Sequence, residues 1–195
     1  MSVAFVFGNG ISRQGLPLND IKQHGSIYGC NALFRDFVPD VLVATDKPIA
    51  LHIEESGYPL ENKFYTRRPT AGKGAFEIPK PYFGFSSGPA ATALAALDGH
   101  RKIYMIGFDM GPTPDKKFNN LYAGTEFYKD TGSVPTYTGN WVKQVQQICR
   151  DFDSTTFIRV CGTTTARVVE LDNIFNLAHL PIMEFIDRLN KQKDF

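Results

Sequence analysis

The residues best suited to chemistry in this sequence stand directly after short apolar runs. Gly8, Asn9, Gly10 and Ser12 follow the apolar run 3–7. Glycine lets backbone N–H groups approach an anion closely, and an asparagine amide offers a donor and an acceptor without charge. The glycine spacing matches neither a dinucleotide fingerprint nor a P-loop. The motif therefore predicts either an uncharged phosphate-binding turn or only a tight connection between a strand and a helix.

Further residues stand at comparable places, either after a predicted strand or at the start of a predicted helix, and all but one phenylalanine are polar residues or glycines. They are Asn31, Asp46, Ser86, Ser87, Gly88, Phe108 and Asp109. Because open α/β sheets bind ligands beyond the carboxyl ends of their strands, this set predicts one site for an anionic ligand rich in hydroxyl groups. Taken singly, Asn31 or Asp46 is more typical of a helix cap, whose oxygen satisfies a free backbone N–H.

Two other motifs each allow two interpretations. Arg67 and Arg68 follow the fourth predicted strand and form either a phosphate-facing pair or solvated surface charge. The run 161–165, a cysteine, a glycine and three threonines, follows the last predicted strand. It predicts either a turn that cradles an anion or the start of a threonine-capped helix.

Six apolar runs predict the strands that position these residues: 3–7, 26–29, 41–45, 63–66, 102–107 and 156–161. Apolar spacing and glycine or proline punctuation predict helices at 90–97, 141–152 and 182–189. Strands that alternate with helices imply a mostly parallel sheet with helices on both faces. We therefore expect an α/β fold, a Rossmann-like three-layer α/β/α arrangement with about six or more strands.

Two long segments, 67–88 and 108–139, are rich in glycine and proline and do not fit this alternation. Loops of that length inside a compact domain are usually functional. The second contains Tyr122, other aromatic residues and two adjacent asparagines. It predicts either a lid that closes over a sugar or a base, or a loop that its aromatic residues pin to the surface.

Composition limits the classes of protein that remain. The chain has 195 residues, 43% hydrophobic and 21% charged, so we expect one globular domain over residues 1–195. A net charge of +1 argues against a duplex nucleic-acid binder. No apolar run approaches the roughly 20 residues of a membrane helix, and no signal peptide is recognisable, so we expect a cytoplasmic protein without a membrane span. Cys30, Cys149 and Cys161 are expected to be buried, reduced thiols.

Recognisable metal or hydrolase motifs are scarce. The four histidines show no metal-ligand spacing, and no Gly-x-Ser-x-Gly motif occurs. An Asp-x-Asp pair occurs only at Asp151 and Asp153, at the end of a predicted helix rather than of a strand. We therefore expect no metal ligands and no cofactor.

The motifs resemble, in order, those of the bacterial sialyltransferases of glycosyltransferase family 42. The set comprises Gly8-Asn9-Gly10-x-Ser12, Cys30-Asn31, Ser86-Ser87-Gly88 and the run 103–109 that ends in Phe108-Asp109. It also resembles the related pterin pyrophosphokinase-like domains, and both resemblances span about residues 1–160. The first implies a metal-independent enzyme of Rossmann-like fold that uses CMP-sialic acid.

The resemblance also implies roles for single residues. Asn9 and Asn31 would contact the phosphate and sugar of the donor, as would the motif 86–88. Phe108 and Asp109 would line the cytidine side, and Asp46 falls near a donor-contacting asparagine of the family. Tyr122 is the counterpart of a tyrosine near the leaving phosphate.

The sequence departs from the family at the general base. The family's histidine follows a Tyr-x-Gly turn, and here Asn140 stands in that place. An amide cannot accept a proton at neutral pH, so this step falls to Asp109 or Asp46, or the acceptor needs little activation. The chain is also shorter than the family's, as in a compact relative encoded by a phage, which would act in the host cytoplasm.

Three functions follow, with different tests. The leading hypothesis is a metal-independent glycosyltransferase that takes a nucleotide-sugar donor, CMP-linked, and an acceptor that the sequence does not identify. The second is a non-catalytic protein that binds a nucleotide or nucleotide-sugar. The third is a Mg²⁺-dependent pyrophosphokinase-like enzyme, for which Asp46 and Asp109 are the only acids at adjacent strand ends. The oligomeric state stays open, a homo-oligomer included.

Overall fold

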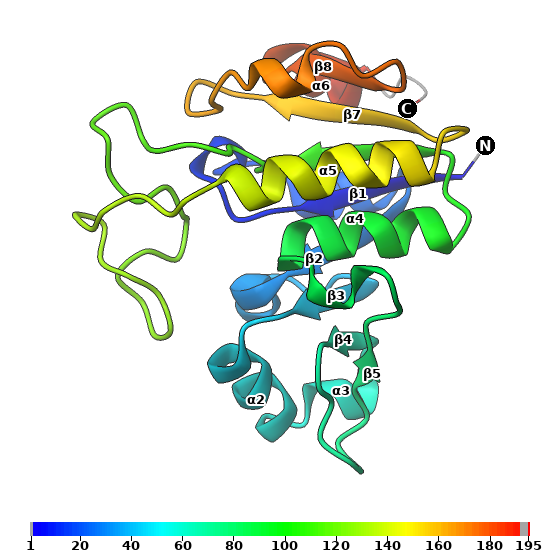
Figure 1. Ribbon diagram of the computed structural model, residues 1–195, viewed down its shortest axis with the longest axis vertical. Coiled ribbons are helices and arrows are strands. Elements are labelled where there is room, and N and C mark those ends of the chain that lie inside the picture. Colours follow the sequence, from blue (N-terminus) through cyan, green and yellow to red (C-terminus); the bar gives the residue numbers. More distant parts are fainter. Residues whose placement is uncertain (1, 192–194) are drawn as a thin grey trace.

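An open sheet of eight parallel strands forms the centre of the fold in the computed structural model, which describes residues 2–191 and 195 (Figure 1). The strands lie in the order β5-β4-β3-β2-β1-β6-β7-β8. Their bounds are β1 (Val3–Phe7), β2 (Ser26–Cys30), β3 (Val41–Ala44), β4 (Phe64–Thr66), β5 (Phe76–Glu77), β6 (Lys102–Ile106), β7 (Thr156–Cys161) and β8 (Leu177–Pro181). The predicted α/β, Rossmann-like class is confirmed.

Helices cover both faces of this sheet. They are α1 (Leu18–Lys22), α2 (Lys47–Glu55), α3 (Tyr58–Glu61), α4 (Ser87–Leu97), α5 (Gly139–Asp151) and α6 (Ile182–Asn190). Helices α4 and α5 pack side by side on one face, and α1 and α6 pack on the other (Figure 1). No helix among the described residues is both long and apolar enough to cross a membrane.

The continuous apolar run of β1 follows from burial on both faces. Ala4 and Val6 pack in the cluster beneath α4 and α5, whereas Phe5 and Phe7 pack in the cluster beneath α1 and α6. All four side chains are fully buried. A strand that is covered on both sides has no polar face, so its sequence reads as uninterrupted hydrophobic residues.

The two outer strands, β5 and β8, were not predicted from the sequence. Both residues of β5 are exposed, and β8 exposes Ala178, His179 and Pro181. Edge strands are covered less completely than central ones, so they lack the apolar run that marks a central strand. The predicted loop 67–88 accordingly contains β5, a short 3₁₀ turn at Tyr82–Gly84 and the start of α4. The segment 108–138 contains no helix or strand, as expected.

The thiols differ in burial. Cys30 and Cys149 are buried as expected, but Cys161 is only half-buried because it ends β7, next to the partly exposed edge strand β8. All three are free thiols.

The chain reverses its direction of travel across the sheet at β1. From β1 it runs outward through β2, β3, β4 and β5, and then crosses back to β6 on the other side of β1. Such a reversal leaves a crevice beyond the carboxyl ends of the two strands that flank it. The segment 108–138 projects from this same edge of the sheet (Figure 1).

Candidate functional site

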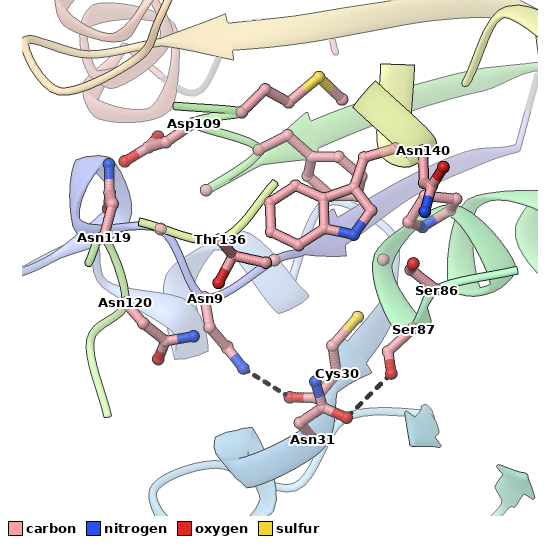
Figure 2. Close-up of a pocket in the computed structure, with 18 of the residues that line it drawn as sticks. Asn9, Cys30, Asn31, Ser86, Ser87, Asp109, Asn119, Asn120, Thr136 and Asn140 are labelled. Atoms are coloured by element: carbon pink, nitrogen blue, oxygen red, sulfur yellow. Dashed lines mark hydrogen bonds between the residues drawn. The ribbon is translucent and has the colours of Figure 1, made fainter. Parts of the chain in front are cut away.

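A pocket of about 350 Å³ lies at this edge of the sheet, between β1 and its neighbours (Figure 2). Its volume falls within the range of small-molecule sites. It brings together most of the residues singled out from the sequence: Gly8, Asn9, Gly10, Asn31, Asp46, Ser86, Ser87, Gly88, Phe108, Asp109 and Asn140. Ser12 and Tyr122 are not among its lining residues.

Glycines allow the turns after β1 and β6 to interlock at the floor of the pocket. The N–H of Gly10 donates to the carbonyl of Gly107 at 2.9 Å. A Cβ at Gly8 would lie 2.7 Å from the carbonyl oxygen of Gly107, and Gly107 itself has a φ of +74°. Gly8 is therefore required by close packing of backbone, and Gly107 also by its left-handed conformation.

The amide of Asn9 is oriented by a buried arginine. The Arg13 Nη2 donates to Asn9 Oδ1 at 3.0 Å, and its Nε donates to the carbonyl of Gly8 at 2.6 Å. Because a guanidinium can only donate, the Asn9 oxygen must face Arg13. The Asn9 Nδ2 then donates to the carbonyl of Cys30 at 3.0 Å, and its second hydrogen is available to the pocket.

The amide of Asn31 is oriented in a similar way by two hydroxyl groups. The Ser87 Oγ donates to Asn31 Oδ1 at 2.9 Å and accepts the N–H of Thr45 at 3.0 Å. Since the single Ser87 proton points to Asn31, the Thr45 hydroxyl must be the donor in its 3.0 Å contact with Ser87. The Asn31 Nδ2 has no partner among the described residues. Asn31 has a φ of +51°, a left-handed conformation that asparagine tolerates better than most residues.

A third amide comes from the segment 108–138. Asn120 Oδ1 accepts the N–H of Tyr122 at 2.9 Å, and its amide nitrogen has no partner within residues 2–191 and 195. Figure 2 shows this nitrogen pointing toward Asn9. The segment is tied to the site by a bond from the N–H of Leu121 to the carbonyl of Asn9 at 2.8 Å. Asn9, Asn31 and Asn120 thus present N–H donors, and not oxygens, to one pocket.

Two helices add further donors. The N-termini of α4 and α5 both line the pocket, α4 through Ser86 and Ser87 and α5 through Asn140. The first N–H groups of a helix have no partner within it, and the helix dipole places partial positive charge there. Gly88 lies in the first turn of α4, and a Cβ there would lie 3.2 Å from the ring of Phe108. A larger residue at this position would therefore crowd the pocket wall at the N-terminus of α4. The pocket is therefore suited to an anion.

Asp109 lies in the pocket wall, but its carboxylate oxygens already accept hydrogen bonds from other residues of the protein. Its carboxylate accepts hydrogen bonds from the N–H of Ser12 at 3.0 Å and from the hydroxyls of Thr164 and Thr165 at 2.8 and 3.1 Å. The buried Arg159 donates to the carbonyls of Phe108 and Asp109 and fixes the same turn. The threonine-rich run 161–165 does cradle an anion, and that anion is the Asp109 side chain.

Tyr122 and Ser12 serve the structure around the pocket. The Tyr122 hydroxyl donates to Asp36 Oδ2 at 2.6 Å and lies 3.4 Å from Arg13 Nη2. Burial, followed by the hydrogen bond to Asp36, raises the pKa of Tyr122 to about 12. The tyrosine therefore stays protonated and supports Arg13 from outside the pocket. The Ser12 side chain likewise does not line the pocket, and its backbone N–H is bound to Asp109.

The lining includes residues that the sequence did not single out as site residues. Among them are Thr45, Asn119, Thr136, Tyr137 and Trp141. Four of these belong to β3 and its turn or to the segment 108–138, and their positions depend on how distant parts of the chain meet. Arg67 also lines the pocket, with its Nη2 bound to the carbonyls of Gly84 and Phe85, whereas Arg68 does not.

Within residues 2–191 and 195, no three His, Cys, Asp or Glu side chains are grouped closely enough to hold a metal ion. The carboxylates in the pocket lining are Asp46 and Asp109, which stand at different strand ends. The donors of the site are thus amides, hydroxyls and backbone N–H groups, together with Arg67.

A comparison with solved structures finds a similar fold in the sialyltransferase CstII from Campylobacter jejuni, solved in complex with a substrate analogue, cytidine-5'-monophosphate. The two chains share 13% sequence identity over 91% of this chain and 85% of that chain, with a TM-score of 0.48. No protein-family model and no curated protein matches the sequence. The similarity concerns the course of the chain and says nothing of the substrate.

Proposed function

We propose that this protein binds a nucleotide-activated sugar, CMP-linked, and transfers the sugar to an acceptor without a metal ion. The observation that carries the proposal is the orientation of Asn9, Asn31 and Asn120. Each amide oxygen already accepts a hydrogen bond from the protein, and each amide keeps at least one N–H without an acceptor among the described residues. Such a set fits a ligand group that only accepts hydrogen bonds, and a phosphate is the commonest group of that kind.

The order of the strands indicates how a ligand would lie along the edge of the sheet. Neighbouring strands lie about 4.8 Å apart, so the edge from β3 through β2 and β1 to β6 spans about 14 Å. Charged Asp46 and Arg67 follow the strands at one end, and Met110 stands at the other. The amides lie between them. This arrangement fits a phosphate in the middle, a base on the apolar end beside Trp141, and a sugar at the charged end.

The same donors would assist the transfer. When the bond between sugar and phosphate breaks, negative charge grows on the leaving phosphate, and preorganised N–H groups stabilise that charge. The amides and the helix N-termini supply this without a metal ion. The motif resemblance to the sialyltransferases of family 42 favours CMP as the nucleotide.

A specific observation favours a second candidate, a protein that binds the nucleotide-sugar without turnover. Asn140 stands where the resembling family has its catalytic base, and Asp109 is engaged by three donors of the protein. An amide cannot accept a proton at neutral pH, and the oxygens of Asp109 already accept hydrogen bonds from the protein. The two candidates make the same prediction for binding and opposite predictions for product formation.

Calorimetry and product analysis test the proposal together. We expect CMP and CMP-sialic acid to bind the purified protein, with weaker binding of UDP- and GDP-sugars and of cytidine, which carries no phosphate. A ligand at about 100 times its dissociation constant should add about 2.7 kcal/mol of apparent stability, which a thermal-shift assay detects. Release of CMP, measured by chromatography, separates the enzyme from the binding protein. Absence of nucleotide binding would refute both.

A further inference from the structure

Transfer of a sugar to a hydroxyl group releases a proton, and the pocket must provide a group to accept it. Among the described residues that line the pocket there is no histidine, and the acidic side chains are Asp46 and Asp109. The amides and hydroxyls of the lining cannot accept a proton at neutral pH. Burial raises the pKa of the Cys30 thiol, which also lines the pocket, to about 12, so it is not ionised there. The choice is therefore between two carboxylates.

Asp109 is a structural carboxylate. Ser12, Thr164 and Thr165 donate to its two oxygens. Its carboxylate is therefore already engaged by the protein.

Asp46 has the opposite environment. It lies two residues after the end of β3, at the residue that precedes α2, and its side chain makes no capping hydrogen bond. The residue is exposed, and no hydrogen bond or ion pair of the described part of the chain involves its carboxylate. Arg67 lines the same end of the pocket but forms no ion pair with it within that part. Both carboxylate oxygens are therefore available to a ligand.

We propose that Asp46 is the general base of the transfer, an inference that rests on the function proposed above. The acceptor oxygen forms a bond to the anomeric carbon of the sugar while the bond from that carbon to the phosphate oxygen breaks. The electron pair of the broken bond stays on the nucleotide phosphate, among the amide N–H groups. The acceptor's proton passes to a carboxylate oxygen of Asp46. The same step with water as acceptor gives hydrolysis of the donor.

The variant Asp46→Asn tests the assignment because it keeps the size of the side chain and removes its negative charge and its ability to accept a proton. Asparagine is as favourable as aspartate before a helix, so the fold of α2 should be retained. With CMP-sialic acid as donor and water as acceptor, we expect kcat for CMP release to fall by about 10²–10⁴-fold. The dissociation constant for CMP should change by less than about threefold, which corresponds to less than about 1 kcal/mol. Asp153→Asn, an exposed aspartate outside the pocket, is the matched control.

A second variant distinguishes loss of the proton acceptor from an indirect disturbance of the pocket. Asp46→Ala should lose the same activity and regain part of it when formate is added, since formate can occupy the space and accept the proton. Normal turnover by Asp46→Asn would overturn the role of Asp46 while leaving nucleotide binding intact. Binding of CMP-sialic acid by the wild type without turnover would also overturn it. No binding of CMP or CMP-sialic acid would instead refute the proposed function.

Discussion

Replacement of Asn31 by aspartate is the most direct test of the amide-lined pocket. The change keeps the oxygen that accepts the Ser87 hydroxyl and removes only the amide nitrogen, which has no partner among the described residues. It also keeps a residue type that tolerates the φ of +51°. The protein should therefore fold as before, and any loss should appear in ligand binding.

The expected loss has two parts. A hydrogen bond from Asn31 to a charged phosphate contributes about 1.5–3 kcal/mol, and it is removed. The new carboxylate then faces the phosphate, and two like charges about 4 Å apart repel by about 4 kcal/mol at an effective dielectric constant near 20. Because each 1.4 kcal/mol is tenfold in affinity, together they should weaken CMP binding by about 10⁴–10⁵-fold.

Titration calorimetry with CMP and with cytidine measures this effect. The loss should be confined to CMP, because cytidine carries no phosphate for the new charge to repel. Asn19→Asp, an exposed asparagine outside the pocket, controls for the added negative charge. If Asn31→Asp bound CMP within about threefold of the wild type, under about 1 kcal/mol, the Asn31 nitrogen would not face the phosphate.

Three further predictions concern the stability of the protein and the position of the nucleotide base. Ser87→Ala leaves the buried N–H of Thr45 without its acceptor and should lower the free energy of unfolding in urea by about 1–3 kcal/mol, whereas Ser86→Ala should not; equal losses would contradict the hydrogen-bond assignment. Trp141→Ala should weaken CMP binding by about 1–3 kcal/mol but leave the binding of ribose 5-phosphate, which has no nucleotide base, unchanged. An equal loss for both ligands would show that the nucleotide base does not lie beside Trp141. Burial raises the pKa of Cys30 from 9.0 to about 12, so the stability that its neutral thiol contributes is present below pH 9 and is lost as pH rises toward 12. The melting temperature should fall over that range, and less steeply in Cys30→Ala; an unchanged slope would exclude this thiol as a cause.

Much of the site could be found from the sequence because of where its residues stand. Asn9, Asn31 and Asp46 each lie one or two residues after the end of a strand, and a parallel sheet brings such positions to one edge. The central strands were visible because burial on both faces leaves uninterrupted apolar runs. The pocket therefore lies where the strand ends predicted it.

The roles of single residues were harder to predict. Tyr122 and Asp109 are polar and close to the site in sequence, but their partners are Asp36, Thr164 and Thr165, which are distant along the chain. In the folded protein these partners hold the Tyr122 hydroxyl away from the pocket lining and bind the Asp109 carboxylate. A motif gives the type of a side chain, and it does not tell whether the protein itself already occupies that side chain.

The sequence alone determined the alternation of strands and helices, the parallel sheet and the edge at which polar residues gather, because these depend on local apolar patterns and on chain direction. Only the tertiary structure decided which atom each amide shows to the pocket. That choice depends on Arg13, Ser87 and the N–H of Tyr122, because each is a donor that claims one amide oxygen. Ser87 lies 56 positions from Asn31, and a bond of that kind leaves no pattern in the sequence. Arg13 and Tyr122 lie only four and two positions from their asparagines, but the turns that hold them are fixed by backbone bonds from Gly10 to Gly107 and from Leu121 to Asn9, so the chemical character of the pocket emerges only once the chain has folded.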